Sequence, residues 1–84
     1  MSKTIVIPHP ILEIKYIGWV EKIVLSLIRQ EQVSKGYCDL RDWEIGSELQ
    51  IHTVQVNRYI KKLSELGLLE RERQGARRKM RVRV

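Results

Sequence analysis

The segment DWEIGSELQIHTVQVNRYIKKLSELGLL, residues 42–69, has the spacing of two short helices joined by a tight turn. Ile45 and Leu49 give the first helix its apolar spacing, and the connection falls at about residues 50–52. With Val56 at 0° and about 100° added per residue, the other apolar side chains of the second helix cluster within about 80° of it. They are Tyr59, Ile60, Leu63 and Leu66. This clustering predicts a second helix with one buried face.

The opposite side of this second helix is polar and carries long cations. Between about 100° and 200° from Val56 lie Val54, Asn57, Arg58, Lys61 and Glu65, with Gln55 and Lys62 on one flank. A helix that is merely solvated also has a polar outer face. Two helices joined by so short a connection, however, cross at a steep angle and leave the second one exposed. The segment therefore predicts a helix-turn-helix over about residues 41–66.

The stretch RERQGARRKMRVRV, residues 71–84, alternates apolar and basic residues, which predicts a β-hairpin. A type II′ turn with Gly75 and Ala76 at its centre places Leu69 opposite Val82. On one face of this hairpin, Leu69, Met80 and Val82 then pack on the core. On the other face, two opposite-charge pairs form, Glu70 with Arg81 and Glu72 with Lys79. The cations expected to stay unpaired near the tip are Arg71, Arg73, Arg77 and Arg78.

The first half of the chain predicts one long helix between two short strands. The helix spans about residues 17–33, and Leu25 lies on its exposed side. Its buried face consists of Val20, Ile23, Val24, Leu27 and Ile28. The β-branched TIVI, residues 4–7, ends at two prolines, and YCDL, residues 37–40, is long enough for a single strand. Either Asp39 or Asp42 is expected to cap the helix that follows.

Residues 42–75, DWEIGSELQIHTVQVNRYIKKLSELGLLERERQG, resemble the helix-turn-helix and wing of bacterial winged-helix DNA-binding domains. Those domains characteristically have a Glu-Ile-Ala-like segment, a Leu-x-Ile turn, a polar recognition helix and a Leu-Gly-Leu exit. Gly46 takes the position where the two helices touch, Ile51 the buried turn position and Gly67 the helix C-cap. Gln50 stands where such motifs commonly have Gly for a left-handed backbone, so we expect a less regular turn.

The resemblance covers about residues 40–84, and it implies a mainly α fold with a small β-sheet. That fold is a winged helix-turn-helix with a three-helix core and a C-terminal β-hairpin wing, at about residues 68–84. We expect residues 1–84 to form one such domain, a length that leaves no room for a second. With IPHPILEIKYIGWVEKIVLSLIRQ in front, the chain is also loosely similar to N-terminal domains of phage and plasmid replication initiators, such as the bacteriophage replication protein O family.

The charge of the chain is unevenly distributed. Residues 1–50 carry six Lys/Arg against seven Asp/Glu, whereas residues 51–84 carry ten against three. Such asymmetry indicates nucleic-acid or membrane contact, and the apolar runs are too short to span a bilayer or to form a signal peptide. The single cysteine, Cys38, is expected to pack as a small hydrophobe in a reducing cytoplasm. Nothing in the sequence has the spacing of a metal site, cofactor site or catalytic set, so we expect no enzyme.

The resemblance and the charge together predict binding to double-stranded DNA. A recognition helix at about residues 53–66 enters the major groove, where Arg58 contacts guanine, Asn57 adenine and Val54 a thymine methyl. Phosphates are expected to contact Thr53, Gln55, Lys61 and Lys62 from the helix, and wing arginines suit phosphates or a narrow minor groove. The wing set is Arg71, Arg73, Arg77 and Arg78. The domain is expected to serve a transcriptional regulator or the origin-binding module of a phage or plasmid replication protein.

A protein-interaction module within a larger assembly is the alternative, since winged helices also act as scaffolds. That function predicts an apolar surface patch, for which Trp19, Leu25 and Trp43 are the candidates. RNA is a weaker expectation, because no aromatic residues stand among the basic ones to stack exposed bases. A homodimer or a larger replication or transcription complex is compatible with either reading. The chain stops inside the predicted last strand, as a fragment of a longer protein would.

Overall fold

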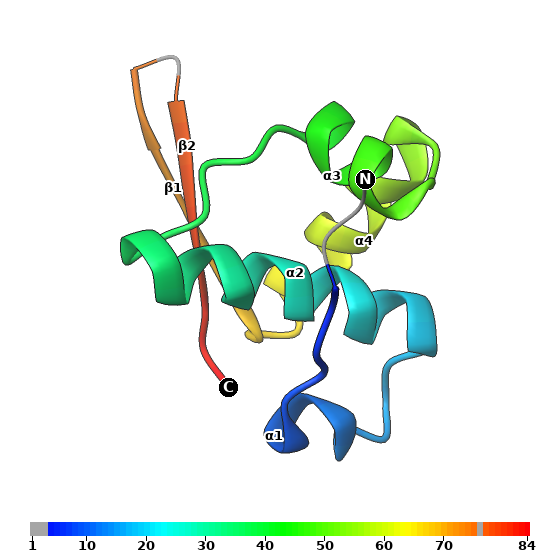
Figure 1. The fold of residues 1–84 in the computed structure, drawn as a ribbon. Helices are drawn as coiled ribbons and strands as arrows, with labels where there is room; N and C mark the ends of the chain where they lie inside the picture. The colour runs from blue at the N-terminus through cyan, green and yellow to red at the C-terminus, as the bar shows by residue number, and fades with distance from the viewer. Residues whose placement is uncertain (1–3, 76) are drawn as a thin grey trace.

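The computed structural model describes residues 4–75 and 77–84, which form four helices and a two-stranded antiparallel sheet (Figure 1). The elements in chain order are α1 (His9–Leu12), α2 (Trp19–Lys35), α3 (Asp42–Leu49), α4 (Thr53–Glu65), β1 (Leu69–Gln74) and β2 (Arg77–Val82). Helices α2, α3 and α4 pack on one another, and the sheet contacts α2 and α4. The fold is therefore a mainly helical winged helix-turn-helix, as the sequence predicts.

The strand expected at residues 4–7 is absent from the described structure. Ile5 and Ile7 instead pack on the core from an irregular segment, which runs across α2 in Figure 1. The side-chain amide of Gln30 on α2 donates to the carbonyl oxygen of Thr4 at 3.2 Å. A β-branched run forms a strand only where another strand edge lies beside it, and this segment lies beside a helix.

Helix α2 is shifted by two residues from its predicted range. It begins after Gly18, whose backbone N–H donates to the Glu21 carboxylate at 2.6 Å, and ends at Gly36, where φ is 90°. The prediction that Leu25 is exposed is wrong, because Leu25 is fully buried. Helix α2 is packed against α1, α3, α4 and β2, which leaves few of its side chains open to solvent. Val20, predicted to be buried, is 40% exposed in the first turn.

Helix α3 begins without the expected aspartate cap. Its N-cap residue is Arg41, whose backbone N–H donates to the Glu44 carboxylate at 2.9 Å. This is the return bond of a capping box, which satisfies a backbone donor at the helix start. Asp42 is already the first residue of the helix, and neither Asp39 nor Asp42 makes a capping bond among the described contacts. The Asp42 carboxylate is thereby free to contact other elements.

The turn between α3 and α4 packs its backbone closely against Gly46 of α3, whose carbonyl oxygen accepts from the backbone N–H of Ile51 at 2.9 Å. A Cβ atom on Gly46 would lie 2.5 Å from the carbonyl oxygen of Ile51, so only glycine fits there without a shift. Gln50 has φ 56° and ψ 46°, the left-handed conformation that a glycine would adopt more easily. The expected irregularity of the turn is therefore not seen, and the non-glycine residue costs about 1 kcal/mol.

Helix α4 has the two faces that the periodicity predicts. Val56, Ile60 and Leu63 are fully buried, and Tyr59 is half-buried. Leu66 is 41% exposed, contrary to the prediction, because α4 ends at Glu65 and Leu66 stands at its C-cap. Gly67 then takes a φ of 78°, which turns the chain into the sheet.

The hairpin has the predicted register in all six pairs, from Leu69 opposite Val82 to Gln74 opposite Arg77. Leu69, Met80 and Val82 are buried, as expected. Gly75 has φ 60°, while the predicted type II′ turn also depends on Ala76, which lies outside the described residues. Instead of a strand over residues 37–40, Cys38 alone makes an antiparallel bridge to Met80. Cys38 is buried and packs as a small apolar side chain. Burial raises the pKa of its thiol to about 11, so the thiol stays protonated at neutral pH.

Candidate nucleic-acid interface

The outer face of α4 is open to solvent. Every residue of this helix predicted to contact DNA is exposed: Thr53, Val54, Gln55, Asn57, Arg58, Lys61 and Lys62. The helix begins at His52, whose ring Nδ1 accepts a hydrogen bond from the backbone N–H of Val54 at 3.2 Å. Val54 is 51% exposed, as an apolar group among polar neighbours. This face combines a methyl-bearing side chain, amides and guanidinium and ammonium groups in one helix.

Asp42 links this face to the wing. Its Oδ2 atom accepts a hydrogen bond from Nδ2 of Asn57 at 3.0 Å, and its Oδ1 atom lies 2.7 Å from Nη2 of Arg78. Arg78 Nη2 also donates to the carbonyl oxygen of Leu40 at 3.0 Å. The prediction that Arg78 stays unpaired is therefore wrong. The register places Arg78 on the same face as the buried Met80, so its side chain points toward the helices.

Lys62 of α4 forms an ion pair with Glu21 in the first turn of α2. Its ammonium lies 2.9 Å from a carboxylate oxygen of Glu21, whose side chain is only 8% exposed. Burial raises the pKa of Glu21, but the bonds from Lys62 and from the Gly18 backbone, together with the Lys62 charge, outweigh it and lower the pKa. Lys62 therefore ties α4 to the start of α2, although half of its side chain is exposed.

The exposed face of the wing differs from the predicted charge pairs. Glu72 lies 3.7 Å from Arg81, and Glu70 lies 3.2 Å from Arg83. Each glutamate thus contacts the residue two places beyond its direct partner, a diagonal neighbour within reach of long side chains in a twisted hairpin. The ammonium of Lys79 instead lies 4.6 Å from the ring centre of Tyr37. Glu70 and Glu72 thus stand opposite Arg81 and Lys79, as predicted, but these ion contacts of their side chains are diagonal.

Three predicted arginines of the wing remain open to solvent. Arg71, Arg73 and Arg77 are exposed, and within residues 4–75 and 77–84 no carboxylate lies within ion-pair distance of them. Arg71 and Arg73 project from β1, and Arg77 begins β2 beside the turn. These three guanidinium groups are therefore open to an external anion.

A groove separates the wing from the helix-turn-helix. Its walls come from the end of α2, the connection to α3, the starts of α3 and α4, and the wing. The lining residues are Lys35, Asp39, Leu40, Arg41, Asp42, Trp43, Glu44, Thr53, Arg73, Arg77 and Arg78. The sequence predicts DNA contacts for Thr53 and the three wing arginines, makes Trp43 a candidate only for a protein-binding patch, and predicts no role for Arg41. The sequence signal for a place of Arg41 and Trp43 in the groove is their position, directly before and inside the first helix of the motif.

The apolar candidates for a protein-binding patch lie apart. Leu25 is buried, Trp43 lies in the groove and is 58% exposed, and Trp19 is 64% exposed at the start of α2. The ammonium of Lys22 lies 4.8 Å from the Trp19 ring centre. The three residues proposed from sequence thus form no common patch.

No protein-family model, curated protein or solved structure matches this chain. Within the described residues, no three His, Cys, Asp or Glu side chains gather as metal ligands would. Over the same part of the chain, every helix is too short or too polar to cross a bilayer. The features that bear on function are therefore the fold, the groove and the exposed cations.

Proposed function

We propose that this chain is a winged-helix domain that binds double-stranded DNA, with α4 in the major groove and the wing on the adjacent backbone. The observation that carries the proposal is the meeting of two basic elements at one groove. Thr53, at the start of α4, and Arg73 and Arg77, on the wing, line the same groove. A duplex placed against this side meets both elements at once.

The shape of α4 suits the major groove. Its 13 residues form a rod about 20 Å long and about 10 to 12 Å in diameter, and the major groove of B-form DNA is about 12 Å wide. Arg58 lies near the middle of the exposed face and carries a planar pair of donors that match O6 and N7 of guanine. Val54, one turn earlier, offers methyl groups to a thymine methyl.

The contact with Asp42 orients Asn57 for the same role. A carboxylate oxygen accepts but cannot donate, so the atom that faces it must be the amide nitrogen. One N–H and the Oδ1 atom of Asn57 then remain for N7 and N6 of adenine. We infer that Asn57 reads adenine in a fixed orientation and that Asp42 is its positioning residue.

Phosphates would be held by cations that have no strong internal partner. Lys61, Arg71, Arg73 and Arg77 meet this condition among the described residues, and Thr53 and Gln55 add neutral donors. Lys62 and Arg78 are occupied by Glu21 and Asp42, so we assign them to holding the domain together. In the cytoplasm, the domain would serve phage or plasmid replication or transcriptional regulation, and the N-terminal resemblance favours replication.

A salt titration tests the proposal. Affinity for a labelled duplex, measured by fluorescence anisotropy, should fall with salt at a log-log slope of about −0.9 per phosphate contact, hence about −3.6 for four cations. Quadruple substitution of Lys61, Arg71, Arg73 and Arg77 by Gln should nearly flatten the dependence. A salt-independent affinity for the unaltered chain, or no affinity for any duplex at low salt, would overturn the proposal.

A further inference from the structure

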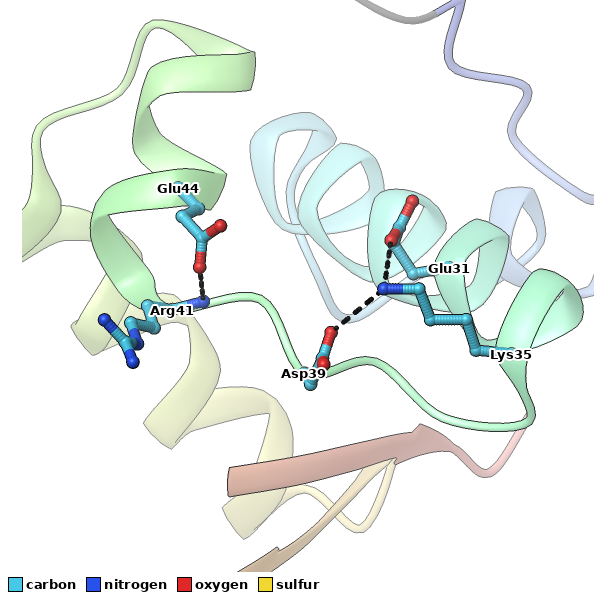
Figure 2. A network of polar contacts seen from close by, with 5 residues as sticks. All are labelled: Glu31, Lys35, Asp39, Arg41 and Glu44. Atoms are coloured by element: carbon cyan, nitrogen blue, oxygen red, sulfur yellow. Dashed lines mark hydrogen bonds and ion pairs between the residues drawn. The ribbon is translucent and has the colours of Figure 1, made fainter. Parts of the chain in front are cut away.

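The carboxylates in the groove are engaged by groups of the chain itself. Lys35 lies 3.4 Å from Asp39 and 4.0 Å from Glu31, as Figure 2 shows. Glu44 accepts from the backbone N–H of Arg41, and Asp42 contacts Arg78. Asp39 and Asp42 are therefore paired with cations of the chain, and Glu44 is hydrogen-bonded to its backbone, before any ligand arrives.

Three guanidinium groups of the lining are left over. Arg41, Arg73 and Arg77 are exposed and have no carboxylate within ion-pair distance in the described part of the chain. In Figure 2 the Arg41 side chain extends away from Glu44 and from the Lys35 contacts. Arg73 and Arg77 come from the wing and Arg41 from the start of α3, so the charges flank the groove from two sides. Such an arrangement attracts an anion to the space between them.

The remaining lining suits a sugar rather than a free inorganic ion. Trp43 exposes 58% of its surface, beside Leu40 and the exposed Thr53. An indole ring offers an apolar face to a deoxyribose, and a hydroxyl can donate to a phosphate oxygen. The lining thus offers both apolar and anion-binding groups, and a sugar-phosphate chain presents both kinds of surface.

We propose that this groove binds one sugar-phosphate strand of the DNA duplex, with Arg41 as an added phosphate contact and Trp43 packed against the sugar. The inference rests on the proposed function and adds a specific track for the backbone between α4 and the wing. It assigns to Arg41 and Trp43 roles that neither the composition nor the helical periodicity indicates. The third wall of the interface is then the start of α3.

Two single-tryptophan variants test the track. Trp19→Phe leaves Trp43 as the only tryptophan, and Trp43→Phe leaves Trp19, which stands near the opposite end of α2, about 24 Å along the helix from Lys35. An unlabelled duplex should shield Trp43 from acrylamide quenching and leave the quenching of Trp19 unchanged. Equal quenching of Trp43 with and without saturating duplex would overturn the proposal, and so would shielding by a single-stranded oligonucleotide at lower concentrations than by the duplex.

An arginine variant tests the phosphate contact separately. Arg41→Ala should reduce the salt slope by about 0.9 and weaken duplex binding about fivefold at 0.15 M salt, since 0.15 to the power −0.9 is about 5.5. Lys15→Ala, an exposed cation between α1 and α2, is the matched control and should leave the slope unchanged. Circular dichroism should give equal melting temperatures, because the cap uses the Arg41 backbone rather than its side chain.

The failure of this inference differs from the failure of the proposed function. If Arg41→Ala matches Lys15→Ala while the unaltered chain keeps its steep salt slope, the groove track is wrong and DNA binding stands. If the unaltered chain has no affinity for duplex, both proposals fall together. A loss for Arg41→Ala that Arg41→Lys restores would support a phosphate contact, since lysine keeps the charge.

Discussion

Arg78→Ala should destabilise the fold, although Arg78 belongs to a basic run on the wing. The substitution removes the guanidinium 2.7 Å from Asp42 and leaves that carboxylate, 18% exposed, without its counter-charge. Breaking a fully buried pair costs about 3 to 5 kcal/mol and an exposed one less than about 1 kcal/mol. The side chains of Arg78 and Asp42 are about four-fifths buried, so we expect the substitution to lower the free energy of unfolding by about 2 kcal/mol. In a domain of this size that corresponds to a melting temperature about 10 °C lower.

The matched control is the neighbouring Arg77→Ala, which removes the same side chain from an exposed position. Its melting temperature should stay within about 3 °C of the unaltered chain, because surface changes cost at most about 0.5 kcal/mol. Thermal denaturation followed by circular dichroism measures both. Asp42→Asn in the Arg78→Ala background should recover part of the loss by removing the unpaired charge. Equal melting temperatures for Arg77→Ala and Arg78→Ala would refute the structural role of Arg78.

Three further predictions concern the core, the turn and the link between α4 and α2. Val56→Asp buries an unpaired charge and should unfold the domain at 25 °C, whereas Arg58→Ala should leave thermal melting nearly unchanged. Gly46→Ala places a Cβ 2.5 Å from a turn carbonyl oxygen and should cost about 1 to 3 kcal/mol in urea denaturation; an unchanged midpoint would contradict the contact. Lys62→Ala should lower stability at pH 7. The lowered pKa of Glu21 gives its full stabilisation above the usual value of 4.5, and this stabilisation is lost as the pH falls from there through the folded-state pKa. The difference from the unaltered chain should therefore shrink below pH 4.5, and a pH-independent difference would contradict the role of the pair.

Local patterns account for what the sequence predicts correctly. The faces of α4 follow from a 3.6-residue period, and the hairpin register follows from a turn at Gly75 and a two-residue alternation. Both signals need only neighbouring residues, so they need no knowledge of the rest of the fold. Fold class is predictable for the same reason.

Long-range contacts account for the errors. Leu25 follows an exposed-face spacing, but it is fully buried in a helix on which α1, α3, α4 and β2 all pack. Arg78 and Asp42 stand 36 positions apart, and no sequence pattern indicates that the hairpin brings them together. The groove also depends on long-range contacts, because Arg41 and Arg77 line it together only when the wing packs beside the helices. The groove can therefore be identified only from the tertiary structure, whereas helix α4 and its two faces can be predicted from the sequence.

Competition binding between a selected duplex and a scrambled one tests the central division of roles most directly. Arg58→Ala should weaken binding to the selected duplex more than to the scrambled one, by about 1 to 3 kcal/mol, because Arg58 is placed to read a base. The double change Arg73→Ala, Arg77→Ala should weaken binding to both by similar factors and reduce the salt slope by about 2, because these side chains meet phosphates. Loss of discrimination in the wing variant, with discrimination kept in Arg58→Ala, would contradict the account.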